Sequence, residues 1–273
     1  LFIWTFGLGI RGAAYATVLS QFVALIWQFW IFSNPKELIH LKRGIYSLRG
    51  DLMKNIIGIG ISPFSMNVCA CMVVIFINNQ LVRFGGDMSV GAFGIANRIV
   101  FIFVMFVMGI NQGMQPIAGY NYGAQKLDRM MQVVKLSIIA ATAIMILGWF
   151  LAMLAPRQCV SLFTTDQHLI DTTVHGMQRM MMMLPIVGYQ MVITNFFQCI
   201  GKVKISIFLS MSRQLLFLLP ALALLPMWFG LDGVWLAQPV SDLIASVVTA
   251  WIMIVYMHKF KLQHKENQYG RQE

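Results

Sequence analysis

The chain has 273 residues, of which 58% are hydrophobic and 11% are charged, whereas a soluble globular domain carries about a quarter charged residues. Twenty Lys and Arg against ten Asp and Glu leave a net charge of +10, and the mean hydropathy is +0.71. This combination excludes a soluble enzyme, a disordered tail and a nucleic-acid-binding domain, because a nucleic-acid binder spreads its Lys and Arg over a solvated face. The composition indicates an all-α integral membrane protein that lies in a lipid bilayer and has no nucleic-acid partner.

Seven apolar segments are long enough to cross a bilayer as helices, which takes roughly 20 residues each. Charged residues or Gly and Pro separate one segment from the next. In chain order, the predicted spans are 12–33, 55–82, 90–118, 131–155, 174–199, 205–228 and 234–257.

The connections between these spans differ in charge, and this difference predicts their orientation. One alternate set of connections holds fifteen Lys and Arg, and the other holds three. Because basic connections stay in the cytoplasm, we expect the first residues outside and the carboxyl terminus inside. The connection 34–54 interleaves Leu and Ile with basic residues, as a short helix on the inner membrane surface does; a solvated linker is the alternative. The tail 258–273 is polar, and we expect it to fray.

Cysteine and histidine give no sign of a catalytic or metal centre. Four Cys in so long a chain form no disulfide framework, and three of them lie in apolar runs. His175 lies at the mouth of a span without a metal-ligand partner at helical spacing. We therefore expect no metal, no cofactor and no enzymatic activity.

A weak internal repeat predicts how the spans are grouped. The sequence GAAYATVLSQ over 12–21 shares Gly, Ala and Ser at matching offsets with GVWLAQPVSD over 233–242. Six spans separate the two blocks, an even number, so both copies keep one orientation, as parallel repeats in transporters do. The prediction is that 1–33 is the last helix of an N-terminal lobe, 34–54 a cytoplasmic connection between lobes, 55–257 a C-terminal six-helix lobe and 258–273 a cytoplasmic tail. The missing N-terminal lobe would bring the intact protein to about twelve spans, so the chain is expected to be a fragment.

Several short blocks resemble those of the multidrug and toxic compound extrusion (MATE) family. They are the two repeat blocks, GINQGMQPIAGYNYGAQ over 109–125, FQCIGK over 197–202 and SRQL over 212–215. The similarity implies the sixth to twelfth helices of a two-lobe transporter in a bacterial inner membrane. It further implies alternating access and export of drugs or small organic cations in exchange for H⁺ or Na⁺. Sodium-coupled members carry acids in their seventh and tenth helices, whereas the corresponding spans here, 55–82 and 174–199, contain no Asp or Glu.

Charged residues within the spans are the first candidates for function, because each costs several kcal/mol to insert. They are Arg98, Arg179, Arg213 and Asp242. Asp242 lies about eight residues into its span, or about 12 Å at 1.5 Å per residue. It is a coupling candidate, since a proton-coupled exporter needs a carboxylate that takes up a proton inside the membrane. The alternative is an ion pair with Arg98 or Arg179.

Polar and soft side chains repeat along one face of two spans. In 90–118 they are Asn97, Phe101, Met105, Met108, Gln112 and Gln115, and in 174–199 they are Arg179, Met183, Ile186, Gln190 and Thr194. Their spacing of three and four residues keeps each set on one helical face. Flexible Met side chains suit a cavity wall that accepts varied organic molecules, but amides that bond across helices give the same pattern. Asn67 lies near Pro63, where it can line the cavity or satisfy a carbonyl freed by the proline.

Two other classes of membrane protein share parts of this pattern. A lipid-linked oligosaccharide flippase has the same two-lobe architecture and would place cations such as Arg98 and Arg179 along its cavity to meet a pyrophosphate. A heptahelical receptor has seven spans, but it ends its third span with an acidic-Arg pair and carries an Asn-Pro motif late in the seventh, and neither is present.

Overall fold

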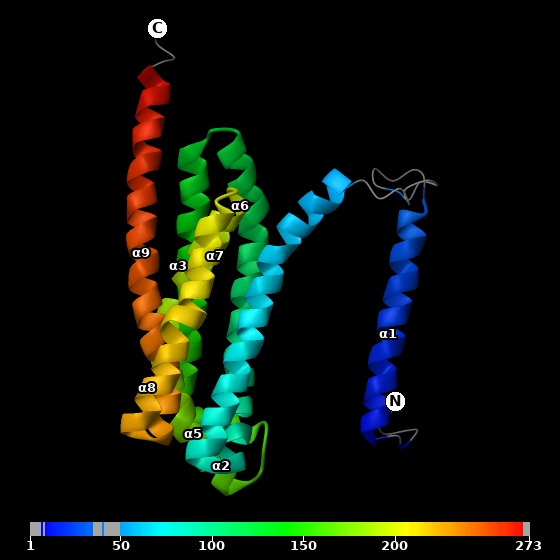
Figure 1. Cartoon of the computed structure of the whole chain (residues 1–273), viewed down its shortest axis with the longest axis vertical. Coiled ribbons are helices and arrows are strands. Elements are labelled where there is room, and N and C mark those ends of the chain that lie inside the picture. The colour runs from blue at the N-terminus through cyan, green and yellow to red at the C-terminus, as the bar shows by residue number, and fades with distance from the viewer. Residues whose placement is uncertain (1–6, 8, 35–39, 41–49, 270–273) are drawn as a thin grey trace. The chain divides into compact units, whose positions relative to one another are not determined.

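The computed structural model describes residues 7, 9–34, 40 and 50–269, with the side chains of 55, 56, 58–63, 65, 66 and 258–269 excepted. The elements are α1 (Gly9–Phe32), α2 (Gly50–Gly123), α3 (Leu127–Leu154), α4 (Pro156–Ser161), α5 (Gln167–Met180), α6 (Leu184–Cys199), α7 (Val203–Met211), the π-helical segment η1 (Ser212–Leu218), α8 (Leu219–Phe229) and α9 (Leu231–Tyr269). Over this part of the chain there is no strand (Figure 1). Two compact units contain them, Leu1–Gly60 and Ile61–Glu273.

The first unit holds α1, whose apolar side chains are almost entirely exposed. Gly12 is the only buried residue among those described in α1. The predicted surface helix or linker of 34–54 falls mostly on 35–39 and 41–49, which lie outside the described residues.

Gly86 divides α2 into two helices. Its backbone has φ 70° and ψ −176°, a conformation that Gly adopts far more readily than other residues. From this point the chain runs back in the opposite direction (Figure 1). The two parts contain the predicted spans 55–82 and 90–118, and the helix begins earlier than predicted, at Gly50 within the expected connection 34–54. The turn between the two spans lies at Gly85 and Gly86.

The length and composition of the helices agree with seven membrane spans. Five helices in the described part of the chain are long and apolar enough to cross a membrane, and the bent pair α5 and α6 adds a sixth. One of the five, Asn67–Gly123, has 57 residues and contains the turn at Gly86, so it accounts for two spans. The fold is therefore an all-α membrane architecture.

Three spans differ in detail from the simple helices that hydropathy predicts. The span 174–199 breaks over Met181–Met183, and α5 and α6 meet there at a bend of 55°. The span 205–228 consists of α7, η1 and α8, with a π-helix at its centre. The expectation that the tail frays from 258 is wrong for its backbone, because α9 remains helical as far as Tyr269.

Close approach of helices holds the second unit together. α3 lies along α6, and α9 lies against α5, α6, η1 and α8. A Cβ atom on Gly188 of α6 would lie only 2.9 Å from the carbonyl oxygen of Ala141 in α3. Gly176 of α5 leaves the space that the indole ring of Trp235 fills. Small residues at such positions allow helix backbones to approach closely inside a membrane, where packing drives association.

Candidate substrate cavity

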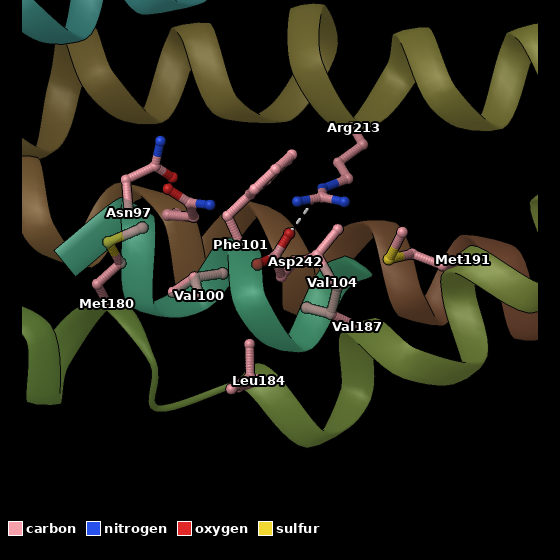
Figure 2. A pocket seen from close by; sticks show the side chains of 11 residues that line it. Asn97, Val100, Phe101, Val104, Met180, Leu184, Val187, Met191, Arg213 and Asp242 are labelled. Carbon is pink, nitrogen blue, oxygen red and sulfur yellow. Dashed lines mark ion pairs between the residues drawn. The ribbon is translucent and has the colours of Figure 1, made fainter. Parts of the chain in front are cut away.

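The second unit contains a cavity of about 190 Å³ between α2, the junction of α5 and α6, η1 and α9. Its walls are mostly apolar, with a few polar side chains on the sides formed by α2, η1 and α9 (Figure 2). The lining residues are Asn97, Val100, Phe101, Val104, Met180, Leu184, Val187, Met191, Arg213, Gln238 and Asp242. Aliphatic, aromatic and thioether groups around a few polar groups are typical of small-molecule sites. We call this space the front cavity.

An ion pair between η1 and α9 lies in the wall of the front cavity. Nε of Arg213 is 2.8 Å from Oδ1 of Asp242, and the two side chains are 29% and 6% exposed (Figure 2). The hydroxyl of Ser241 also donates a hydrogen bond of 2.8 Å to the carbonyl oxygen of Arg213. A π-helix is a wide turn that leaves main-chain groups irregularly paired and is frequent at functional sites. Two successive residues of α9 therefore fix both the backbone and the side chain of Arg213.

A second pocket of about 310 Å³ adjoins the front cavity. Met191 and Arg213 line both spaces, and the other walls of the second pocket are rich in amides and hydroxyls. They are contributed by Gln190, Thr194, Asn195, Gln198, Ser210 and Gln214, together with Met108 and Leu209. Oε1 of Gln190 is buried without a hydrogen-bond partner, whereas Oδ1 of Asn195 accepts from Nε2 of Gln115 at 3.0 Å. We call this space the amide pocket.

A separate group of charges lies where α5 meets the start of α9. Arg179 forms an ion pair of 2.9 Å with Asp232 and contacts Nδ1 of His175 at 2.7 Å. Arg157 forms an exposed ion pair with Asp171. Asp232 is ten residues before Asp242, about 15 Å along a helix. Arg179 is therefore held away from Asp242, and it lines neither the front cavity nor the amide pocket.

The predicted site residues occupy several different places. Asn97, Phe101 and Asp242 line the front cavity, and Gln190 lines the amide pocket. The structure places Arg213 beside Asp242, in place of the expected Arg98 or Arg179. Outside both spaces, Asn67, Arg98, Met105 and Gln112 are exposed, and Met183 is half-buried in the break between α5 and α6. The cavity-lining role of these residues remains a prediction.

Gln238 is the polar residue of the front cavity that the sequence patterns did not select, and Arg213 was selected as an intramembrane charge but not as a cavity residue or as the partner of Asp242. Periodicity along one helix does not say which side chain of another helix an intramembrane arginine meets. The signal was nevertheless present, since Arg213 belongs to the block SRQL over 212–215 and the deepest acid, Asp242, needed a cation. Gln238 lies four residues before Asp242, on the same face of α9.

The helical spans and the cavity between them, which has an ion pair in its wall, define a polytopic membrane protein with an internal cavity. The MatE family model matches residues 61–222, more than half of the chain, and the chain belongs to this family. It is similar to the multidrug export protein MepA of Staphylococcus aureus, with 24% identity over 96% of this chain and 57% of that protein. The chain thus spans little more than half the length of this relative.

Solved structures of two transporter states share the fold. One is an outward-facing multidrug resistance MATE family transporter of the MOP superfamily, with a TM-score of 0.80 and 23% identity. The other is an inward-facing transporter of the same description, with a TM-score of 0.80 and 22% identity. Each match covers 95% of this chain, and 59% and 60% of the two solved chains respectively.

Proposed function

We propose that the chain is the C-terminal lobe, with the preceding helix, of a secondary active transporter that exports drugs or organic cations. The transporter exchanges them for H⁺ or Na⁺ across a bacterial inner membrane, with the first residues outside and the carboxyl terminus in the cytoplasm. Membership of the MatE family and similarity to a multidrug export protein support this proposal. The observation that carries it is a cavity with soft apolar walls and the ion pair of Arg213 with the buried Asp242, within a lobe made of membrane spans.

The chemistry of the front cavity suits organic cations. Phe101, Met180 and Met191 provide polarizable surfaces, and an aromatic ring attracts a cation through its face. Asp242 places an acidic group in the cavity wall, and its pairing with Arg213 limits the cost of burying a charge there. A cavity of this kind binds molecules by hydrophobic contact and charge, and it tolerates differences in their shape.

The third span carries exposed side chains on the face that borders the front cavity. Phe101, Met105 and Met108 are 51%, 59% and 47% exposed, on a helix that packs against the lobe through other residues such as Ala96, Val107 and Met114. We propose that a second lobe covers this face in the working transporter, so that Asn97, Phe101, Met105 and Gln112 line one shared vestibule. Asn67 and Met183 are assigned to the same vestibule as cavity candidates.

Alternating access needs lobes that keep their internal fold while the space between them opens to either side. The present fold matches transporters described as outward-facing and as inward-facing with the same TM-score of 0.80. We propose that the lobe moves largely as one body, with its bends at Met181–Met183 and η1 as the places where it can adjust.

The charges in the lobe argue against the flippase alternative. A pyrophosphate carries several negative charges and needs unpaired cations along its path. Among the described residues, Arg179 and Arg213 line pockets, and one acid balances the charge of each, Asp232 and Asp242 respectively. Neither place therefore has the net positive charge that a multiply charged pyrophosphate requires. Arg98 is exposed and lines neither the front cavity nor the amide pocket.

Efflux of a cationic dye tests the proposed function. Cells that lack their main drug exporters are loaded with ethidium, and its loss is followed with the intact gene or an empty vector. The proposal expects faster loss with the gene. Addition of a protonophore, or removal of external Na⁺, then identifies the coupling ion. Equal rates with the gene and with the vector, at a confirmed level of protein in the membrane, would refute drug export.

A further inference from the structure

We infer that the amide pocket binds a carboxylate group of the transported compound, so that the favoured substrates carry a carboxylate as well as a cationic group. This inference rests on the proposed function for the identity of the ligand as a transported compound. Its structural basis is the part of Arg213 that the ion pair leaves unused, and the composition of the surrounding walls.

Arg213 has free donors that Asp242 does not occupy. The ion pair joins Oδ1 of Asp242 to Nε at 2.8 Å, and among the described residues no hydrogen bond is found from the two terminal amino groups. A guanidinium presents five N–H donors in a planar fork, whose parallel pairs match the two oxygens of a carboxylate. The side chain of Arg213 is 29% exposed and is accessible from the pockets that it lines. The side chain of Asp242 is only 6% exposed, so a ligand in the amide pocket would contact Arg213 first.

The remaining walls of the amide pocket offer donors and no competing negative charge. Among the residues that the structure describes, no Asp or Glu lines this pocket. The side chains of Gln198, Ser210 and Gln214 face it without a hydrogen-bond partner in the same part of the chain, and the buried Oε1 of Gln190 is also unpartnered. Gln198 is exposed and Ser210 and Gln214 are half-buried, so their polar groups are open to the pocket, whereas Oε1 of Gln190 is buried, where the lack of a partner is costly. A carboxylate together with bound water would satisfy the donors, and a ligand N–H or O–H would satisfy Gln190.

The position of Arg213 between the two spaces places both charges of such a ligand. Met191 and Arg213 line the front cavity as well as the amide pocket, so one elongated molecule can extend through both. Its carboxylate would meet the guanidinium fork in the amide pocket, and its cationic group would lie near Asp242 and Phe101 in the front cavity. A molecule with only the cationic group would leave the amide pocket unfilled.

Binding of a matched pair of dyes to the purified protein tests this inference without requiring transport. Rhodamine B carries a carboxylate at neutral pH, and its ethyl ester has the same ring system without that charge. Fluorescence anisotropy gives a Kd for each dye. We expect the acid to bind about tenfold more tightly than the ester, because a charge-assisted hydrogen bond contributes roughly that factor.

The variants remove the proposed fork without leaving a buried charge. Arg213→Gln combined with Asp242→Asn keeps both groups hydrogen-bonding and neutral, and it should abolish the preference for the acid. Arg157→Gln combined with Asp171→Asn neutralises an exposed ion pair in the same way and should retain the preference. Tighter binding of the ester by the wild type, equal binding of the two dyes, or an unchanged preference in the Arg213→Gln/Asp242→Asn protein would overturn the inference. Dye efflux would still test the proposed function separately.

Discussion

Replacing Arg213 by Gln removes the cation from a buried ion pair and leaves the carboxylate of Asp242 with 6% exposure and no charged partner. Loss of one member of a buried pair costs about 3 to 5 kcal/mol. Since the side chain of Arg213 is itself 29% exposed, water can reach the site, and we expect a value near the lower end, about 3 kcal/mol. The reverse change, Asp242→Asn, leaves the more exposed partner unpaired and should cost less.

Unfolding of the purified protein by increasing SDS in mixed micelles measures these differences, and the two single variants with the double variant form a complete cycle. The double variant Arg213→Gln/Asp242→Asn should lie within about 1 kcal/mol of the wild type, because no buried charge remains. Arg157→Gln is the matched control, since both side chains of its ion pair are 63% exposed and its loss should cost less than about 1 kcal/mol. Equal small losses for Arg213→Gln and Arg157→Gln, or additive single effects in the double variant, would refute the assignment of a buried pair.

The remaining predictions concern helix packing, helix capping and whether the chain transports without a second lobe. Gly176→Val should lower thermal stability by about 1 to 3 kcal/mol, because the new side chain would overlap Trp235. Gly94→Ala is the control, since no atom lies within 4 Å of the new Cβ, and it should be neutral or raise stability by about 0.5 to 1 kcal/mol. Equal melting temperatures for the two variants would contradict the packing described. Asp166→Ala should cost about 1 kcal/mol in the same assay, because its carboxylate accepts from the amide of His168 at 2.9 Å at the start of α5, and an Asp166→Asn protein should retain most of that stability. The chain 1–273 alone, purified and placed in vesicles, should not move ethidium along an imposed proton or sodium gradient, since the proposed vestibule needs a second lobe; gradient-driven transport by it would contradict the two-lobe proposal.

Hydropathy predicts the spans well because a bilayer demands long apolar runs, but it carries little information about breaks within them. The turn between the second and third spans is marked by Gly85 and Gly86, and only a residue tolerant of positive φ fits Gly86. The break at Met181–Met183 has no comparable mark, because Met continues an apolar run in a helix or out of it. The π-helix of η1 likewise has no mark in its own sequence, and the hydrogen bond that the hydroxyl of Ser241 in α9 donates to the carbonyl of Arg213 is not visible in either segment alone.

The same limit applies to the site. Periodicity groups Asn97 with Phe101 and predicts that they share a face, and both line the front cavity. It could not pair Asp242 with Arg213, because the rotation and the depth of two helices relative to each other depend on the packing of all of them. By its predicted depth, Arg179 was an equally reasonable partner for Asp242. In the structure, the register of α5 against α9 places Asp232 beside Arg179 instead.

A cavity-filling variant tests most directly whether the front cavity is part of the export route. Val104 lines it, and Val104→Trp would place an indole ring in a space of about 190 Å³. Val82→Trp, at a position that is 49% exposed and lines neither pocket, controls for the added bulk. With equal amounts of protein in the membrane, ethidium efflux should fall to the empty-vector rate for Val104→Trp and stay near the wild-type rate for Val82→Trp. Wild-type efflux by the Val104→Trp protein would contradict the account.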